Sequence, residues 1–392
     1  MDSTKVAIDV IVKNCEVFTQ KDFSIDEIKC YDNSEIPYDY FFKEHMIRNL
    51  PCIIKNISSS WHCTYQWVVN DTINYDHFIT QFGDMEAPIA DCDKINFNAQ
   101  CKSQMKVKDY MYYLKSTNKD ELLYLKDWHL KRLLPKHNFY EVPKIFASDW
   151  LNEFALDHND DDFMFVYIGP KDTWTPFHAD VYTSYSWSVN IVGRKKWILL
   201  PPGEEEKLRD QLGNLPVLFK AESYKNVKYF EVIQEKGDGI FVPSGWHHQV
   251  FNMLDTISIN HNFINASNIE IVWKALLQNL VSVEHEIEEF RETEEFPSQC
   301  QLILKSVFGI DFESFIKFVI HIAQKRLNYL KGEEFLLFNI YYLQKNHIMF
   351  DLYMLLKIFQ QIQTHHFFLK EIPPDIAQKF VDIYHDITKA IK

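Results

Sequence analysis

The sequence lacks the features that mark several classes of protein. Its seven cysteines are odd in number and never form a CxxC pair, so neither a disulfide framework nor a zinc finger is indicated. No uncharged apolar run approaches the roughly 18 residues of a membrane span, and the N-terminus has no basic stretch followed by an apolar core. We therefore expect no membrane partner and a reducing, cytoplasmic location, with nuclear presence left open.

Positive charge is also scarce. Lys and Arg number 41 against 55 Asp and Glu, which gives a formal net charge of −14. This balance argues against electrostatic binding to nucleic acid, so we expect no direct nucleic-acid partner. Two interpretations of the acidic excess remain open: a basic protein partner or substrate, or simply a solvated acidic surface.

Three regions of different character follow one another along the 392 residues. Residues 1–130 mix helical and strand patterns, residues 131–265 are dominated by strand patterns, and residues 266–392 carry apolar side chains at helical spacing. Helical periodicity does not distinguish packing within one chain from a homodimer interface through the C-terminal helices. We predict helices at Val6–Val17 and, in the last region, at 269–290, 299–330, 334–363 and 374–391.

His178 and Asp180 have the spacing of a metal-binding pair. On a β-strand, which we predict over residues 175–182, side chains two apart leave the same face, so an imidazole and a carboxylate can bind one ion together. A second His-x-Asp, His158-Asn-Asp160, shows that the pattern also arises by chance. It lies in a charged run, so we interpret it as a solvated loop.

The third ligand must come from a distant strand. Residues 237–252 contain a predicted turn and strand and offer two adjacent candidates, His247 and His248. Together with the His-x-Asp pair, either would complete a site of two histidines and one carboxylate. This donor set is typical of non-haem Fe(II) oxygenases and leaves coordination positions for other ligands.

Lys195 points to an acidic ligand. Strand alternation places Lys195, Trp197 and Leu199 on one face. A lysine on an apolar face needs a buried anionic partner, because an unpaired charge there is costly. A dicarboxylate that chelates iron at one end and meets Lys195 at the other would fit, with the hydroxyl of Thr175 as a second donor. The alternative is a surface lysine beside two other basic residues.

Three segments together resemble the JmjC family of Fe(II)/2-oxoglutarate oxygenases, in its branch of small hydroxylases. They are 175–180 (Thr-Pro-Phe-His-Ala-Asp), 193–197 (Gly-Arg-Lys-Lys-Trp) and 237–252, and the resemblance spans roughly residues 36 to 265. It implies an α+β fold: a double-stranded β-helix core, the cupin or jelly-roll arrangement, with N-terminal α/β elements and a C-terminal helical region.

The resemblance also implies the cofactors and the metal ligands. Fe(II), 2-oxoglutarate and O2 are expected, with ascorbate as a stimulant. The family pattern makes His178, Asp180 and His248 the catalytic iron ligands. It leaves His247 as a residue that lines the site.

Positions that contact 2-oxoglutarate follow from the same resemblance. Lys195 and Thr175 are expected to hold the C5 carboxylate. Tyr124, Asn260 and Ser188 match other cosubstrate positions. Ser188 replaces an Asn found in a sister branch, which puts one hydrogen bond to the cosubstrate in doubt.

Residues 186–197 and 243–262 resemble, more narrowly, lysyl hydroxylases that act on the eukaryotic translation release factor. The implied reaction is hydroxylation of a lysine C–H bond, coupled to oxidative decarboxylation of 2-oxoglutarate to succinate and CO2, with the release factor as protein partner. Alternatives are an N-methyl-lysine demethylase, a zinc hydrolase with the same ligands, and a catalytically silent cupin that acts as a binding module.

Overall fold

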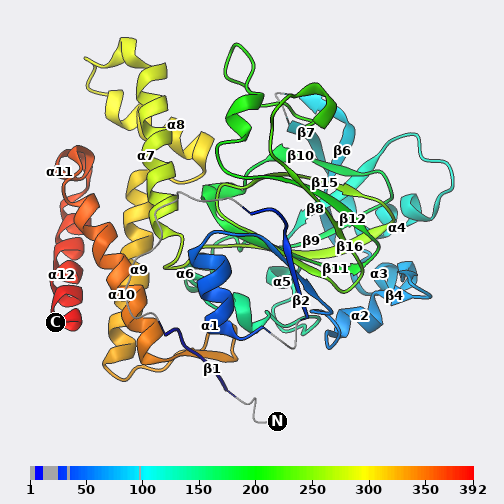
Figure 1. Cartoon of the computed structure of the whole chain (residues 1–392), viewed down its shortest axis with the longest axis horizontal. Coiled ribbons are helices and arrows are strands. Elements are labelled where there is room, and N and C mark those ends of the chain that lie inside the picture. Colours follow the sequence, from blue (N-terminus) through cyan, green and yellow to red (C-terminus); the bar gives the residue numbers. More distant parts are fainter. Residues whose placement is uncertain (1–4, 12–24, 33–35, 97–98) are drawn as a thin grey trace.

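Two facing β-sheets form the centre of the molecule (Figure 1). The computed structural model describes residues 5–11, 25–32, 36–96 and 99–392. Helices flank the sheets, and six of them, α7 to α12, form a separate group after the last strand of the core. The predicted α+β fold with a cupin-type double-stranded core is confirmed.

The larger sheet contains nine strands. One of its faces carries the hydrophobic core, and the other faces the smaller sheet. Its central strands alternate in character: Tyr185, Trp187 and Val189 of β11 pack into the hydrophobic core, whereas Ser186 and Ser188 face the smaller sheet. The strand order is β2 (Lys29–Asp32), β3 (Cys52–Lys55), β14 (Gly239–Val242), β11 (Tyr185–Val192), β16 (Thr256–Phe263), β9 (Met164–Gly169), β8 (Leu123–Trp128), β6 (Glu86–Asn96) and β7 (Ala99–Lys106).

The smaller sheet has four antiparallel strands, in the order β10 (Trp174–His178), β15 (His247–Asn252), β12 (Lys195–Leu200) and β13 (Phe230–Gln234). The strand predicted over 175–182 is therefore too long, because β10 ends at His178. After that residue the chain makes a short 3-10 turn at Val181–Thr183, in which Tyr182 has a positive φ of 56°. Asp180 lies in the connection between strand and turn.

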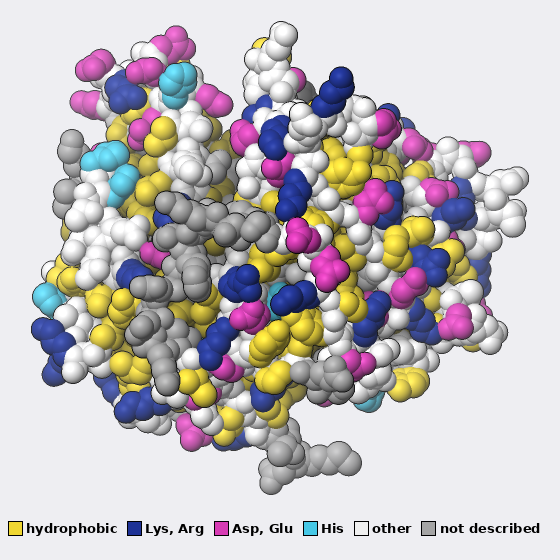
Figure 2. Space-filling view, in the orientation of Figure 1, with side chains coloured by type: hydrophobic (Ala, Val, Ile, Leu, Met, Phe, Trp, Pro, Cys, Tyr) yellow, Lys and Arg dark blue, Asp and Glu magenta, His cyan; other side chains and the backbone are white. Residues whose placement is uncertain are grey.

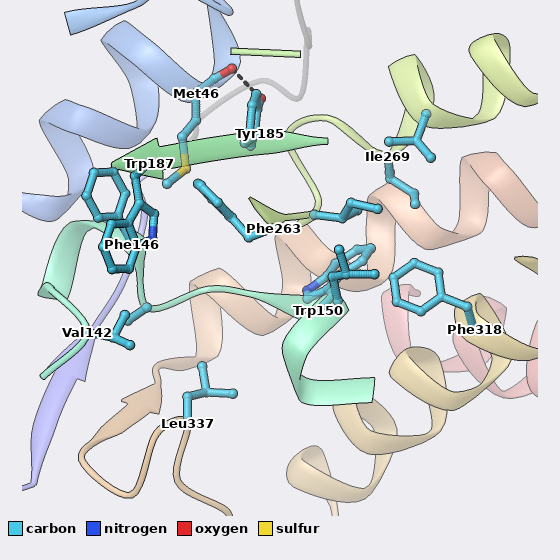
Figure 3. Packing of buried hydrophobic residues seen from close by; sticks show 14 of the residues in the cluster. Met46, Val142, Phe146, Trp150, Tyr185, Trp187, Phe263, Ile269, Phe318 and Leu337 are labelled. Carbon is cyan, nitrogen blue, oxygen red and sulfur yellow. Dashed lines mark hydrogen bonds between the residues drawn. The ribbon is translucent and has the colours of Figure 1, made fainter. Parts of the chain in front are cut away.

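Short helices cover the side of the large sheet that faces away from the small sheet and carries the hydrophobic core. They are α1 (Tyr38–Phe41), which continues into a π-helical turn at Phe42–Ile47, α2 (His62–Gln66), α3 (Tyr75–Phe82), α4 (Val107–Lys115), α5 (Leu130–Leu133) and α6 (Trp150–His158). Figure 3 shows the packing between them and the sheet. The ring of Phe146 stacks on Trp187 at 5.3 Å, and the Tyr185 hydroxyl donates a 2.6 Å hydrogen bond to the Met46 carbonyl.

The C-terminal group consists of α7 (Ile269–Glu286), α8 (Phe296–Phe308), α9 (Phe312–Leu330), α10 (Lys345–Ile362), α11 (His366–Glu371) and α12 (Pro374–Ile391). The helix predicted over 334–363 is wrong in its first part, since β17 (Tyr341–Leu343) precedes α10 and pairs in parallel with β1 (Val6–Ile8). β1 also replaces the start of the helix predicted at Val6–Val17, whose residues 12–17 lie outside the described residues. A small hairpin, β4 (Val68–Val69) and β5 (Thr72–Ile73), completes the strands.

None of the helices within the described ranges is both long and apolar enough to cross a membrane. The face in Figure 2 shows Asp and Glu side chains interspersed with Lys and Arg.

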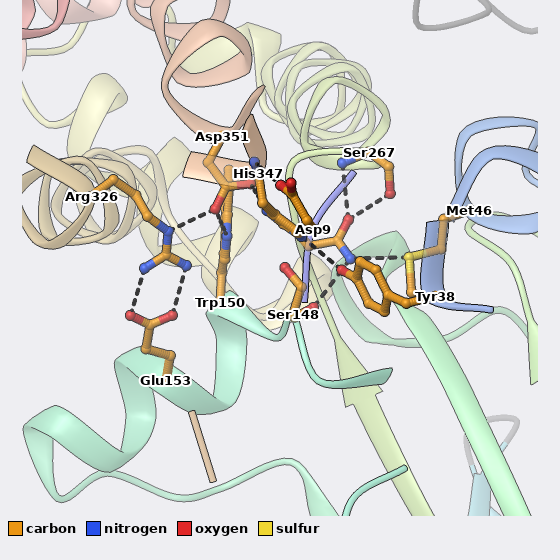
Figure 4. Close-up of polar contacts among 11 residues, drawn as sticks. Asp9, Tyr38, Met46, Ser148, Trp150, Glu153, Ser267, Arg326, His347 and Asp351 are labelled. Carbon is orange, nitrogen blue, oxygen red and sulfur yellow. Dashed lines mark hydrogen bonds and ion pairs between the residues drawn. The ribbon is translucent and has the colours of Figure 1, made fainter. Parts of the chain in front are cut away.

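A buried ionic network ties the C-terminal helices α9 and α10 to α6 (Figure 4). The guanidinium of Arg326 on α9 donates to both carboxylate oxygens of Glu153 on α6, at 2.8 and 2.9 Å, and to Asp351 on α10 at 2.7 Å. Trp150 donates its indole N–H to the same Asp351 carboxylate. The side chains of Arg326 and Asp351 are fully buried, so each charge depends on the others for its solvation.

We predict that Arg326→Met destabilises the protein by about 3 to 5 kcal/mol, because the buried Asp351 then loses its guanidinium partner and Glu153 keeps only Lys325, at 3.0 Å. Urea denaturation of the purified protein measures this change. Arg291→Met is the matched control: this arginine is half exposed and lies 3.8 Å from Glu288, so its loss should change the free energy of unfolding by less than about 1 kcal/mol.

Replacing Glu153 and Asp351 by Met together with Arg326 should recover most of the lost stability, since no unpaired charge then remains in the core. Equal stabilities for Arg326→Met and Arg291→Met would contradict this interpretation of the network.

Candidate metal and cosubstrate site

Pairing between β10 and β15 brings the two histidines together. His178 lies directly opposite His248 in the ladder, and their rings are 4.4 Å apart between centroids. Asp180 follows β10 by two residues. Ligand atoms of His178, Asp180 and His248 all lie within 4.8 Å of one another, so the three side chains can hold one metal ion.

Backbone carbonyls set the orientation of both imidazoles. His178 Nδ1 lies 2.7 Å from the Pro176 carbonyl oxygen, and His248 Nδ1 lies 3.0 Å from that of Trp246. Because a carbonyl can only accept, each Nδ1 carries the proton and donates it. In the neutral ring, each Nε2 then keeps a lone pair for a metal, in the tautomer that metal-binding histidines adopt.

Two polar side chains of the large sheet position the carboxylate. Ser186 donates its hydroxyl to Asp180 Oδ2 at 2.7 Å, and Asn262 donates its amide to Oδ1 at 2.8 Å. Both donors are neutral, so they fix the carboxylate without cancelling its negative charge. The carboxylate is thus held in place although it lies outside a regular strand.

Burial keeps the first histidine neutral. Desolvation, together with the neighbouring His248, lowers the pKa of His178 to about 3. An imidazole binds a metal only in its neutral form. Near neutral pH, His178 therefore needs no deprotonation before it binds an ion.

Lys195 enters the same space from β12. It is 2% exposed, and its Nζ donates a 2.6 Å hydrogen bond to the hydroxyl of Ser258 on β16. Burial, reinforced by the charge of Lys126, lowers the pKa of Lys195 to about 7. A hydroxyl does not neutralise an ammonium, so the site is suited to an added carboxylate.

Of the other predicted cosubstrate residues, Asn260 lies closest to the Lys195 contact in the hydrogen-bond pattern. Asn260 donates to Ser258 Oγ at 3.1 Å, which places its amide next to the Lys195 contact. Tyr124 is buried on β8 and packs over Gly169, where a Cβ would lie 2.5 Å from the tyrosine ring. Ser188 is buried on β11 with no partner for its hydroxyl among the described residues. Thr175 pairs with Val250 across β10 and β15. Their contacts with a cosubstrate stay predictions.

His247 does not line the metal site, contrary to the prediction. Successive residues of β15 point to opposite faces, and His247 stacks on Phe177 at 5.4 Å. Its Nδ1 also lies 3.8 Å from Glu205. These partners belong to the side of the small sheet that faces away from His248.

The chance His-x-Asp is only partly the solvated loop that we predicted. His158 is the last residue of α6, exposed, and its ring lies 4.7 Å from His321. Asp160 is exposed, but Asp162 at the end of the charged run is buried and accepts a hydrogen bond from His129 at 2.6 Å. Neither His158 nor Asp160 approaches the metal-binding cluster.

Sequence reasoning missed the supporting polar residues of the large sheet. Ser258 and Asn262 lie on β16, on either side of the predicted Asn260 and at the same spacing of two, and Ser186 lies on the neighbouring β11. Their period of two was visible in the sequence and indicated a polar face. What the alternation could not reveal is which ligand each side chain supports.

This donor set fits Fe(II) and 2-oxoglutarate. Two imidazoles and one carboxylate on one side of an ion match the facial arrangement of non-haem iron oxygenases. The buried Lys195 ammonium offers a partner for the far carboxylate of a dicarboxylic acid.

Known proteins agree with this assignment. A sequence profile described as a cupin-like domain matches residues 38–269. The chain is 41% identical over 389 residues to the zebrafish (Danio rerio) "2-oxoglutarate and iron-dependent oxygenase JMJD4", with 92% of each chain covered. The chain belongs to the JMJD4 family of cupin-like oxygenases.

The human JMJD4 protein is 42% identical over 315 residues, which cover 75% of each chain. The Arabidopsis thaliana protein named "Arginine-specific demethylase JMJ20" is 37% identical over 324 residues, 75% of this chain and 70% of that protein. As a JMJD4 family member, the chain is an oxygenase that depends on Fe(II), 2-oxoglutarate and O2.

We predict that His248→Ala and Asp180→Ala each abolish turnover of 2-oxoglutarate and lower the iron bound per chain, since either change leaves only two ligands. The adjacent His247→Ala is the matched control and should keep substantial activity, because its ring faces away from the site. Succinate formation and iron content measure both effects. Loss of iron in His247→Ala with full activity in His248→Ala would reverse the ligand assignment.

A second prediction concerns pH. Because the pKa of Lys195 is about 7, the free protein carries the ammonium below that pH and must take up a proton to bind 2-oxoglutarate above it. Affinity should therefore fall as pH rises through about 7, by at most about ten-fold per pH unit. Calorimetry of 2-oxoglutarate binding to the Fe(II)-loaded protein without oxygen measures the fall.

Lys195→Ala should weaken binding across the whole pH range, because the positive charge is gone. Lys195→Arg keeps its charge at all these pH values and should remove the pH dependence. An affinity of the native protein that stays constant on both sides of pH 7 would contradict the proposed anchoring role of Lys195.

Proposed function

We propose that the protein is a lysyl C-hydroxylase of the translation release factor. The observation that carries its oxygenase chemistry is the convergence of His178, Asp180 and His248 beside the buried Lys195. The choice of lysine and of this substrate rests on the resemblance of residues 186–197 and 243–262 to lysyl hydroxylases. A net charge of −14 is compatible with a basic substrate.

The protein's part in the reaction is to bind, orient and exclude water. When bound, iron and 2-oxoglutarate supply the oxidising chemistry: 2-oxoglutarate, O2 and a substrate C–H bond become succinate, CO2 and C–OH. His178, Asp180 and His248 would hold the metal, and Lys195 would orient the cosubstrate. The reaction requires no side chain as acid or base, so the neutral state of His178 is compatible with it.

The complete ligand set argues against a silent binding module, which would not need both imidazoles oriented with Nε2 towards one point. A zinc hydrolase could use the same three ligands. It would give no role to a buried lysine next to them, however, and we therefore favour the oxygenase reaction on a protein substrate.

Demethylation is the second candidate, favoured by the name of the Arabidopsis relative. Both reactions can start with oxidation of a C–H bond. They differ in the carbon attacked: an N-methyl carbon is lost after oxidation, whereas a side-chain carbon keeps its hydroxyl. The mass of the product peptide therefore separates them.

We place this activity in the cytoplasm, where termination of translation occurs, with no nucleic acid in direct contact. A homodimer through the C-terminal helices also stays a prediction, and several apolar side chains of α7 and α8 are exposed, among them Val281, Leu302 and Val307.

We predict that the purified protein, with Fe(II), 2-oxoglutarate and ascorbate, adds one oxygen atom to a lysine of the release factor. Mass spectrometry of the peptides detects the addition. In isotopically heavy O2 the added atom should carry the heavy isotope, because O2 is its source. Asp180→Ala protein is the negative control, and methylated lysine and arginine peptides are assayed in parallel.

Loss of a methyl carbon from those peptides, with no oxygen added to the release factor, would favour the demethylase. Succinate formation without modification of either substrate would keep the oxygenase chemistry but reject both substrates.

A further inference from the structure

A second buried lysine, Lys126, leaves β8 of the large sheet on the side opposite to Leu125, which packs into the hydrophobic core. It is 8% exposed and follows Tyr124 by two residues on β8, so both side chains leave the same face of the strand. Its Nζ lies 5.7 Å from the centre of the Tyr124 ring. Within the described parts of the chain, Lys126 makes no hydrogen bond or ion pair with a side chain.

The adjacent carboxylate is already engaged elsewhere. Asp127 forms an ion pair with the exposed Lys102 at 2.7 Å and accepts a hydrogen bond from the Tyr167 hydroxyl at 2.6 Å. A β-bulge between Leu125 and Trp128, with Asp127 at a positive φ of 57°, lets the strand present both residues in this way. Lys126 is therefore a buried cation, and the adjacent Asp127 carboxylate binds other partners instead.

Strand register places Lys126 level with the end of Lys195. Leu125 pairs with Ile168, which brings Lys126 beside Tyr167 on β9. Tyr167 in turn pairs with Ser258, whose hydroxyl accepts the hydrogen bond from Lys195.

Two aromatic rings lie along the same row. The Lys195 Nζ is 5.9 Å from the centre of the Tyr167 ring, and that ring meets Tyr124 edge to face at 5.9 Å. Lys126 thus approaches from the large sheet and Lys195 from the small one. The charge of Lys126 is close enough to lower the pKa of Lys195 and, as the last of several causes, that of His178.

We propose that Lys126 is a second anchor of 2-oxoglutarate, which binds the far (C5) carboxylate together with Lys195 from the opposite sheet. A bound metal ion already compensates the carboxylate at the other end, where His178 and Asp180 lie. At the far end, the register of β8, β9 and β16 brings the two ammonium groups to one level, where they can share a carboxylate. This inference rests on the 2-oxoglutarate requirement and not on the identity of the protein substrate.

The test compares two ligands that differ only at that end. Calorimetry measures binding of 2-oxoglutarate and of 2-oxopentanoate, which has a methyl group in place of the C5 carboxylate, to Fe(II)-loaded protein without oxygen. We expect Lys126→Met to weaken 2-oxoglutarate binding by about ten-fold to a hundred-fold. Its affinity for 2-oxopentanoate should change by less than about two-fold.

Two comparisons show whether the lysines share one carboxylate. Lys195→Met should show the same selectivity between the ligands, and the double variant should lose less affinity than the two single losses multiplied. Lys108→Met is the matched control: it removes one positive charge from the exposed surface of α4 and should change neither affinity.

Stability supplies a readout that does not depend on turnover. Without ligand, Lys126→Met should melt at a higher temperature than the native protein, because an unpaired buried charge is removed. The rise in melting temperature caused by 2-oxoglutarate should become smaller. Lys126→Gln, which keeps a polar group without the charge, serves if the Met variant does not fold.

Unchanged 2-oxoglutarate affinity in these variants would overturn the proposal, as would an equal loss for both ligands, which would place Lys126 at the metal end. A lower melting temperature without ligand, combined with unchanged affinity, would assign Lys126 a structural role instead. Because no protein substrate is used, failure of the hydroxylase assignment leaves this test intact.

Discussion

The hydrogen-bonded pairing of β10 with β15 is the constraint on which the site depends. It sets His178 opposite His248, although 70 residues separate them in the chain. The same ladder continues through β12, so the backbone that aligns the histidines also directs Lys195 to the face of the small sheet that carries His248. The large sheet then contributes what the small one lacks: Ser186 and Asn262 fix the carboxylate that lies outside the ladder. The metal and cosubstrate ends of the site are thus parts of one arrangement of strands.

Two lysine side chains are buried between the sheets, so positive charge is concentrated there. Lys126 and Lys195 are buried within reach of each other's charge, and the Asp180 carboxylate is held by Ser186 and Asn262 at the metal end. Such an arrangement opposes folding, and the extensive aromatic packing on the other side of the large sheet, around Trp187 and Phe146, offsets it. A dianionic ligand removes the imbalance on binding. Folded proteins commonly lose stability at a functional site and recover it from packing in the rest of the core.

The sequence predicted the fold class and the set of residues that converge, and its failures have physical reasons. The double-stranded core was implied by the resemblance of residues 175–180, 193–197 and 237–252 to the JmjC family. Asp180 was assigned to a strand because no sequence signal announces that β10 stops at His178 and that Tyr182 takes a left-handed conformation. His247 was placed at the site because two adjacent histidines look equivalent until the register decides which one faces inward. Lys126 went unnoticed because its burial depends on β6, β8 and β9 lying side by side, which only tertiary structure establishes.

The pairing of β1 with β17 has a consequence for how the chain reaches its native state. Val6 is hydrogen-bonded in register with Tyr341, so the first described strand has no partner until almost the whole chain exists. At roughly 5 to 20 residues per second, a ribosome takes on the order of 15 to 70 s to cover that distance. The Glu153 carboxylate likewise cannot bind Arg326 until that residue has been synthesised. During most of translation, Glu153 and the apolar residues around it on α6 therefore have no partner from the C-terminal helices. Helices α9 and α10 cover them only near the end of synthesis.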